Sequence, residues 1–162
     1  MNIFILDKDP ILAAQMQCDK HVVKMILESA QLLSTAHHVL DGNAAREGIY
    51  KATHINHPCT VWVRESHANY NWLWWHLASL CEEYEHRYGR MHKTSSLLYK
   101  LHFEPYNIPN LLSTPFAVAM KARPECIVEG DPVQSYRNYY KTKQKDFKMT
   151  WTNREVPSWF NE

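Results

Sequence analysis

The stretch from Cys18 to Ser29 combines an apolar stripe with several ionisable side chains. His21, Lys24 and Glu28 are separated by three and four residues. On a helix, residues at these spacings share one face, so the three side chains form a column. A carboxylate beside a lysine and a histidine is a workable acid–base unit. The structural alternative is an ion pair between Lys24 and Glu28, with His21 bonded to a neighbour.

A second polar cluster stands at the start of the next predicted helix. Its members are Asn56, His57, Arg64, Glu65 and Asn69. The planar guanidinium of Arg64 suits phosphate or carboxylate recognition, although a surface network with its neighbours is the alternative. Anions are favoured at helix amino termini. Because both clusters lie at such helix ends, we expect them to face one cleft.

The ten histidines do not occur at the spacings of a metal site. His37 and His38 are adjacent and point to different sides of a helix, whereas His54 and His57 lie in a loop. Neither pair reproduces a zinc-binding pattern. Known nucleophile motifs and glycine-rich phosphate loops are also absent from the sequence. The sequence therefore predicts no metal and no cofactor.

The overall charge does not single out a nucleic-acid binder, but one segment is basic. Eighteen basic against seventeen acidic residues give a net charge of +1. The segment from Gln134 to Arg154 contains six basic side chains and one acidic side chain, interspersed with aromatic residues. Arg137 and Lys141 are the candidates for phosphate contacts in this segment. The alternative is a solvated helix face.

The sequence has the features of a cytoplasmic protein. Its four cysteines are far apart and form no paired motif, which favours reduced thiols. No segment reaches the length of about 20 apolar residues that a membrane span needs, and the first residues lack a leader pattern. We therefore expect no membrane partner.

The elements that must position these groups are mostly helices. An extended segment, Asn2 to Leu6, is followed by a short helix capped by Asp9 with Pro10 at its first position. Apolar residues recur at helical spacing from Asp19, the expected cap, to Leu40, and Gly42 ends that helix.

A second long helix is predicted from Pro58 to Gly89, with Trp74 inward and with Trp72 and Trp75 at a cleft or a partner interface. Further helices are predicted at 94–103, at 115–120 and after the cap Asp131. Together these elements predict a mainly α fold. Residues 1–162 should form a single compact helical domain with two long helices and a short extended N-terminal segment.

The run HVVKMILE, from His21 to Glu28, resembles the H-x6-E helix of the small pyrimidine-dimer DNA glycosylase/AP-lyase family found in phages. The runs NHPCTVWVRES, NYNWLWW and CEEYEHRYGRMHK are also similar to short phage proteins that commonly carry that family's name. The resemblance covers most of the chain. It implies a helical DNA-repair enzyme whose amino-terminal α-amine attacks C1′ of the damaged nucleotide. The imine formed then undergoes β-elimination, which cuts the strand.

The resemblance also implies roles for individual residues. Glu28 matches the carboxylate that stabilises the cationic sugar and moves protons, and His21 matches the motif's histidine. The family uses the amine exposed when the initiator Met is removed, whereas Asn2 is expected to hinder that removal. Met1 then supplies the amine, or Lys20 or Lys24 does, or glycosylase activity is absent. The α-amine suits this chemistry because its intrinsic pKa is lower than that of a lysine.

Three classes of function remain open on the sequence. The first is a DNA base-excision enzyme, a glycosylase and lyase that works in the bacterial host cytoplasm if the chain is phage-encoded. The second is a phage enzyme that acts on a nucleotide or a modified base through a His/Lys/Glu/Arg anion site. The third is a non-catalytic phage protein that binds a host factor. Candidate contacts to DNA or a nucleotide are Lys20, Asn56, His57, Arg64, Asn69, Arg137 and Lys141.

Overall fold

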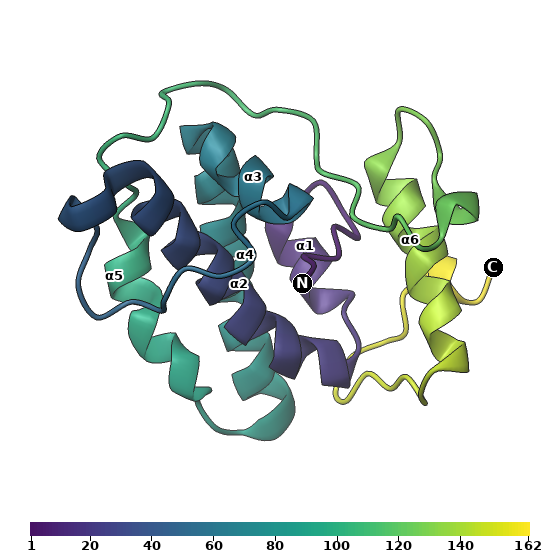
Figure 1. Cartoon of the computed structure of the whole chain (residues 1–162). Helices are drawn as coiled ribbons and strands as arrows, with labels where there is room; N and C mark the ends of the chain where they lie inside the picture. Colours follow the sequence, from purple (N-terminus) through teal and green to yellow (C-terminus); the bar gives the residue numbers. More distant parts are fainter.

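The fold consists of helices and connecting segments without a β-strand, which confirms the mainly α prediction. The computed structural model describes all residues from 1 to 162. Its α-helices are α1 (Pro10–Gln15), α2 (Asp19–Asp41), α3 (Pro58–Glu65), α4 (His67–Tyr88), α5 (Leu98–His102) and α6 (Pro132–Thr142). The two long helices α2 and α4 lie at the centre, with α5 on one side and α6 on the other (Figure 1).

The core forms where α2 and α4 pack against each other. Val22, Ile26 and Leu33 of α2 are buried at helical spacing, as are Leu73 and Leu77 of α4. Side chains at these spacings share a face of a helix, so burying them removes one apolar stripe of each helix from water. No helix is long and apolar enough to cross a lipid bilayer.

Several predicted helix ends are confirmed. One carboxylate oxygen of Asp9 accepts hydrogen bonds from the main-chain nitrogens of Ile11 and Leu12, at 2.7 and 3.3 Å. It thereby satisfies two amides that have no partner within the helix. Gly89 ends α4 with a φ of 67°, a conformation that glycine adopts without a steric penalty.

The prediction of one helix from Pro58 to Gly89 is wrong, because Ser66 divides it into α3 and α4. Ser66 has an extended backbone (φ −154°, ψ 154°), and its hydroxyl accepts a hydrogen bond from the Asn69 main-chain nitrogen. A serine side chain offers this alternative to the helical hydrogen bond, so it can begin a new helix inside a continuous apolar pattern.

The predicted helix at 115–120 is also wrong. This segment is extended, and side chains from distant parts of the chain occupy its main-chain groups. The Tyr136 hydroxyl donates to the Ala117 carbonyl and accepts from the Ala119 nitrogen, while the Asn2 amide donates to the Ala119 carbonyl. These bonds replace the helical ones. Residues 94–103 are helical in part, as a 3-10 turn (Lys93–Leu97) followed by α5.

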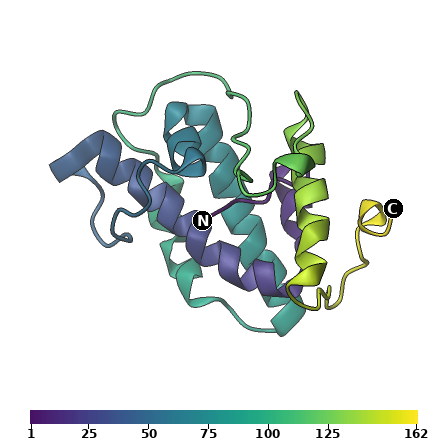
Figure 2. The same ribbon diagram turned by 45° about the vertical axis from the view of Figure 1, so that its right-hand side comes forward.

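Asp19 is the first residue of α2 rather than its cap, which is Cys18. The Asp19 carboxylate instead accepts hydrogen bonds from Arg87 on α4 and from Thr150 and Thr152 near the end of the chain. Arg87 has a fully buried side chain and also binds Glu83 at 2.9 Å. This ion network ties the carboxyl-terminal segment to both long helices. Figure 2 shows this segment leaving the lower end of α6 and running outside it to the carboxyl terminus.

Candidate active site

Residues 1 to 4 form a bend that places the start of the chain at the surface. Phe4 has a φ of +57°, which is rare for a residue with a side chain. The Asn2 side-chain oxygen accepts from the main-chain nitrogens of Ile3 and Phe4, and Gln17 donates to the Ile3 carbonyl. These buried bonds hold the bend, so residues 1 to 4 have a defined path.

The α-amine of Met1 lies beside the carboxylate of Glu28. The Met1 side chain is only 3% exposed although the residue as a whole is partly exposed, so its main-chain end is what reaches the surface. The amine nitrogen is 4.0 Å from Glu28 Oε2, and the Asn2 main-chain nitrogen donates to the same oxygen at 3.0 Å. Lys24 Nζ lies 3.6 Å from Glu28 Oε1. An amine, a carboxylate and a lysine are thus in direct reach of one another.

His57, the cap at the start of α3, lies close enough to the amino terminus and Glu28 for their charges to act on its pKa. Its Nδ1 accepts a hydrogen bond from the Cys59 main-chain nitrogen at 3.1 Å, which leaves the proton on Nε2. Burial lowers the pKa of His57, and the nearby amino-terminal charge lowers it further, while Glu28 acts in the opposite direction. His57 is therefore neutral at pH 7 and can donate from Nε2. Asn56, which precedes it, is exposed.

Members of the two polar clusters therefore lie near each other, because the charge of Glu28 acts on the pKa of His57. Both residues are partly exposed. The three principal cavities of the molecule are lined by other residues. An open site of this kind suits a large ligand, such as a nucleic acid, better than a free nucleotide, because small-molecule sites usually enclose most of the ligand.

His21 does not point toward Glu28 with Lys24, contrary to the predicted column. Its ring stacks on Phe4 with centroids 4.6 Å apart, and its Nδ1 is 2.9 Å from the Tyr140 hydroxyl. That hydroxyl also accepts a hydrogen bond from the Cys18 main-chain nitrogen at 2.8 Å. Burial, followed by Lys143, Lys24 and Lys20, lowers the pKa of His21 to about 4. His21 is thus a neutral support for the bend at Phe4.

Arg64 and Asn69, two further candidates, have their polar groups bonded within the chain. Arg64 donates to the carbonyls of Ile55 and Thr60 and so holds the loop before α3. Asn69 is fully buried, and its amide binds Trp62 and Thr114, so it lies in the interior rather than at the expected surface.

Arg137 donates to the Leu6 carbonyl, pairs with Asp7 at 3.3 Å and stacks on Trp159. It therefore fixes the amino-terminal segment to α6 instead of standing free in a basic face. The guanidinium fork, which suits phosphate, suits this main-chain carbonyl and carboxylate equally well.

Three lysines lie around His21, and one of them, Lys24, also contacts Glu28. Lys20 and Lys24 on α2 and Lys143 after α6 all lie close enough to lower the pKa of His21. Lys20 Nζ sits 4.4 Å above the Phe147 ring, and Lys143 Nζ lies 4.6 Å from the Tyr139 ring centroid. Part of the predicted basic segment, Lys143 and Phe147, therefore lies beside the start of α2. Lys141 lies on α6 and is partly buried.

The sequence reasoning missed Asn2 and Phe4 as the residues that set the position of the amine. A signal was available for Asn2, because asparagine often bonds the main-chain nitrogens that follow it and so favours turns. The positive φ of Phe4 has no such signal, because its stacking partner His21 is 17 positions away along the chain.

Comparison with known proteins assigns the chain to a family. A family model described as pyrimidine dimer DNA glycosylase matches residues 1–98. No curated protein and no solved structure matches the chain. The matched residues are more than half of the 162 and include Met1, Lys24, Glu28 and His57. The chain therefore belongs to the pyrimidine dimer DNA glycosylase family.

Proposed function

We propose that the protein excises a damaged pyrimidine from DNA and then cuts the strand, with the α-amine of Met1 as its nucleophile. The observation that carries this proposal is the 4.0 Å separation between that amine and Glu28 Oε2 at the molecular surface. The apolar Met1 side chain is buried in the opposite direction. The amine is the part of Met1 that a DNA strand can reach.

The proposed reaction balances with the groups at this site. The unprotonated amine attacks C1′, the bond from C1′ to the base breaks, and the base leaves with the electron pair. Glu28 takes the proton that the amine loses and returns it to O4′ as the sugar ring opens, which leaves a protonated imine. Glu28, again a carboxylate, takes a proton from C2′. The bond from C3′ to its phosphate oxygen then breaks, the phosphate leaves with the electron pair, and the strand is cut.

The surrounding residues fit the charges of this reaction. The Glu28 carboxylate is held by the Asn2 main-chain nitrogen, so it is in position before the sugar becomes cationic. Neutral His57 can donate from Nε2 to the departing base or to a phosphate. Lys24 supplies positive charge at Glu28, and Lys20 and Lys143, which lie near His21, extend it toward the start of α2 for the phosphates of the strand.

A second position for the amine comes from the same geometry. The Asn2 main-chain nitrogen already lies 3.0 Å from Glu28 Oε2. If the initiator Met is removed, this nitrogen becomes the terminal amine, and the carboxylate remains beside it. Lys24 is the third candidate, at 3.6 Å from the other carboxylate oxygen.

Borohydride trapping tests the proposal. The protein is incubated with DNA that carries an abasic site, the imine is reduced, and the cross-linked peptide is sequenced by mass spectrometry alongside the intact chain. We expect the adduct on the terminal α-amine and unchanged trapping in Lys24→Arg. An adduct on a lysine would show that this lysine, and not the α-amine, is the nucleophile.

Absence of any adduct would oppose the proposal and favour an enzyme that acts on a nucleotide or a modified base. The same protein is then incubated with ultraviolet-irradiated and with undamaged DNA. Strand cutting of the irradiated DNA alone is the expected result for excision of pyrimidine dimers.

A further inference from the structure

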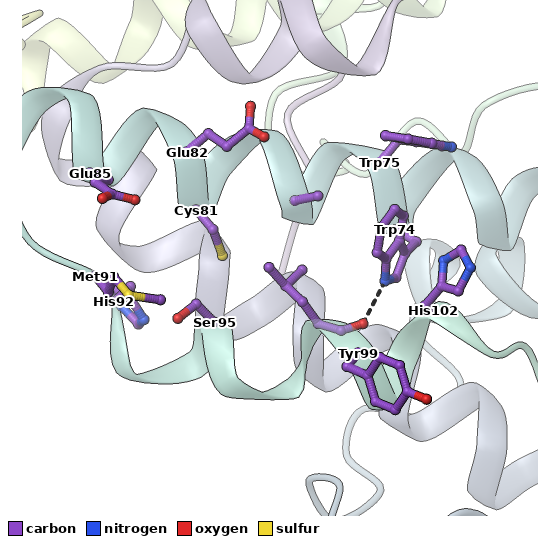
Figure 3. Close-up of a pocket in the computed structure, with 12 residues that line it drawn as sticks. Trp74, Trp75, Cys81, Glu82, Glu85, Met91, His92, Ser95, Tyr99 and His102 are labelled. Carbon is purple, nitrogen blue, oxygen red and sulfur yellow. Dashed lines mark hydrogen bonds between the residues drawn. The ribbon is translucent and has the colours of Figure 1, made fainter.

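A cavity of about 500 Å³ lies on the far side of α4 from the candidate active site. It is bounded by α4 on one side and by the 3-10 turn and α5 on the other (Figure 3). Trp74, Ala78 and Glu82 on α4 line it, whereas Leu73 and Leu77 on the same helix are buried in the core. Met1, Lys24, Glu28 and His57 are not among the residues that line it, so this cavity is separate from the candidate active site.

The walls of the cavity are aromatic. The Trp74 and Trp75 rings meet edge to face with centroids 5.1 Å apart, and Trp74 meets His102 at 4.7 Å. Trp74 Nε1 donates to the Leu98 carbonyl, the bond drawn in Figure 3, which fixes the ring toward the opposite wall. Trp75 is 53% exposed and Tyr99 is 77% exposed, so both keep accessible ring faces.

The charge in the cavity is negative and unpaired. Glu82 and Glu85 line it, both are exposed, and no cation of the chain lies within ion-pair distance of either. No lysine or arginine is among the lining residues. His92, the histidine beside them, has a pKa that burial lowers, so it adds no positive charge at pH 7.

We infer that this cavity binds a small organic cation with an apolar body, such as an aryl or alkyl ammonium compound. Aromatic ring faces attract cations electrostatically, and a carboxylate at the rim adds to that attraction. A nucleic-acid strand would be repelled by the two glutamates. A bare metal ion would find few ligands among indole and phenol rings, because hard cations prefer oxygen donors. The inference does not depend on the proposed DNA chemistry.

Two probes of nearly the same shape separate charge from shape. The first is 4-hydroxyphenyltrimethylammonium, and the second is its neutral analogue 4-tert-butylphenol. Binding is followed by the NMR shifts of the indole N–H groups of Trp74 and Trp75 in the full chain. We expect both indoles to shift with the cation, and the cation to bind about 5-fold or more tightly than the neutral compound.

Substitutions assign the effect to the cavity. Glu82→Gln with Glu85→Gln should weaken the cation about 10-fold and leave the neutral probe unchanged. The exposed Glu129, which has no ion-pair partner and lies outside the cavity, provides the matched control Glu129→Gln. Ala78→Leu, which fills the cavity, should abolish both shifts while circular dichroism stays unchanged.

Equal affinity for the two probes, or an unchanged cation affinity in the glutamine variant, would overturn the inference and leave an apolar cavity without charge selectivity. Absence of indole shifts at ~10 mM probe would overturn it as well.

Discussion

The two carboxylate oxygens of Glu28 have different neighbours, so its pairing with Lys24 can be considered apart from its contact with the terminal amine. Oε2 accepts from the Asn2 main-chain nitrogen and faces the terminal amine, while Oε1 faces Lys24, whose side chain is 61% exposed. An exposed ion pair stabilises a fold by less than about 1 kcal/mol. The pairing of the carboxylate with Lys24 therefore contributes little to stability. We propose that the main role of Glu28 is to act on the amine.

The substitution Glu28→Gln tests that division. Glutamine keeps the size and the oxygen that accepts from Asn2, but it removes the charge and the proton-transfer capacity. We expect glycosylase turnover to fall about 10²-fold or more and the free energy of unfolding to change by less than ~1 kcal/mol. Turnover and chemical unfolding are measured on the same preparation. A large loss of stability with full activity of the folded fraction would make Glu28 an architectural residue.

His57 caps α3, and two substitutions separate this cap from the chemical role that we propose for its ring. Asparagine can also cap a helix, so His57→Asn should keep the start of α3 and remove only the imidazole. We expect it to lower turnover about 10-fold with stability unchanged. His57→Ala loses the cap as well and should cost about 1 kcal/mol more in unfolding experiments. Equal turnover in His57→Asn and the unmodified chain would show that His57 acts only as a cap.

At the scale of elements, the start of α2 and the turn after α6 bring two lysines together near His21. Lys20 comes from α2 and Lys143 follows α6 directly, and both act on His21 between them. Each lysine that contacts a phosphate adds about one unit to the slope of log affinity against log salt. Their position predicts two such contacts.

We expect Lys20→Gln with Lys143→Gln to reduce that slope by about 2 and to weaken DNA binding at low salt. The measurement is fluorescence anisotropy with an abasic duplex across a salt series. Lys93→Gln, an exposed lysine at the 3-10 turn on the opposite side of α4, is the matched control. An unchanged slope in the double variant would leave these lysines as a solvated face.

The elements themselves were largely predictable from local signals, whereas the placement of site residues was not. The caps at Asp9 and Asp131 and the stop at Gly89 depend on neighbours within four residues, and the structure has them as predicted. The break at Ser66 was missed because apolar periodicity continues across it. The helix expected at 115–120 fails because distant side chains, among them Tyr136, take its main-chain groups.

The same contrast holds within the candidate site. The helical spacing of Lys24 and Glu28 was sufficient to predict their contact, at 3.6 Å. The turn of His21 away from them depends on Tyr140, 119 positions further along the chain. No periodic pattern encodes a partner at that separation.

At the scale of the whole molecule, buried histidines make stability depend on pH. Burial lowers the pKa of His21, His37 and His76 to about 4 from the ordinary value of 6.5. Between these two values the unfolded chain binds protons at these side chains and the folded protein does not. The free energy of unfolding therefore falls as the pH is lowered from about 6.5 to about 4.

Each of the three histidines contributes a slope of up to about 1.4 kcal/mol per pH unit in that window. Urea unfolding at a series of pH values measures the total. We expect little further loss from histidines below pH 4, where losses from Asp19 and Glu83 begin, because their pKa values are lowered in the folded protein. A flat stability profile between pH 6.5 and 4 would contradict the buried neutral state of these rings.

The hydrogen bonds that surround the amino terminus determine at which stage of chain synthesis the site can form. The amide of Asn2 is hydrogen-bonded to Ala119, the ring of His21 to Tyr140, and the carboxylate of Asp19 to Thr152. Contacts this far apart along a chain close large loops, whose entropy must be lost before the contacts form. Although the start of the chain leaves the ribosome first, its amine cannot be held at Glu28 until almost the whole chain has been synthesised. The nascent protein is thus expected to be inert toward the DNA around it, and its reactivity begins only when synthesis is nearly complete.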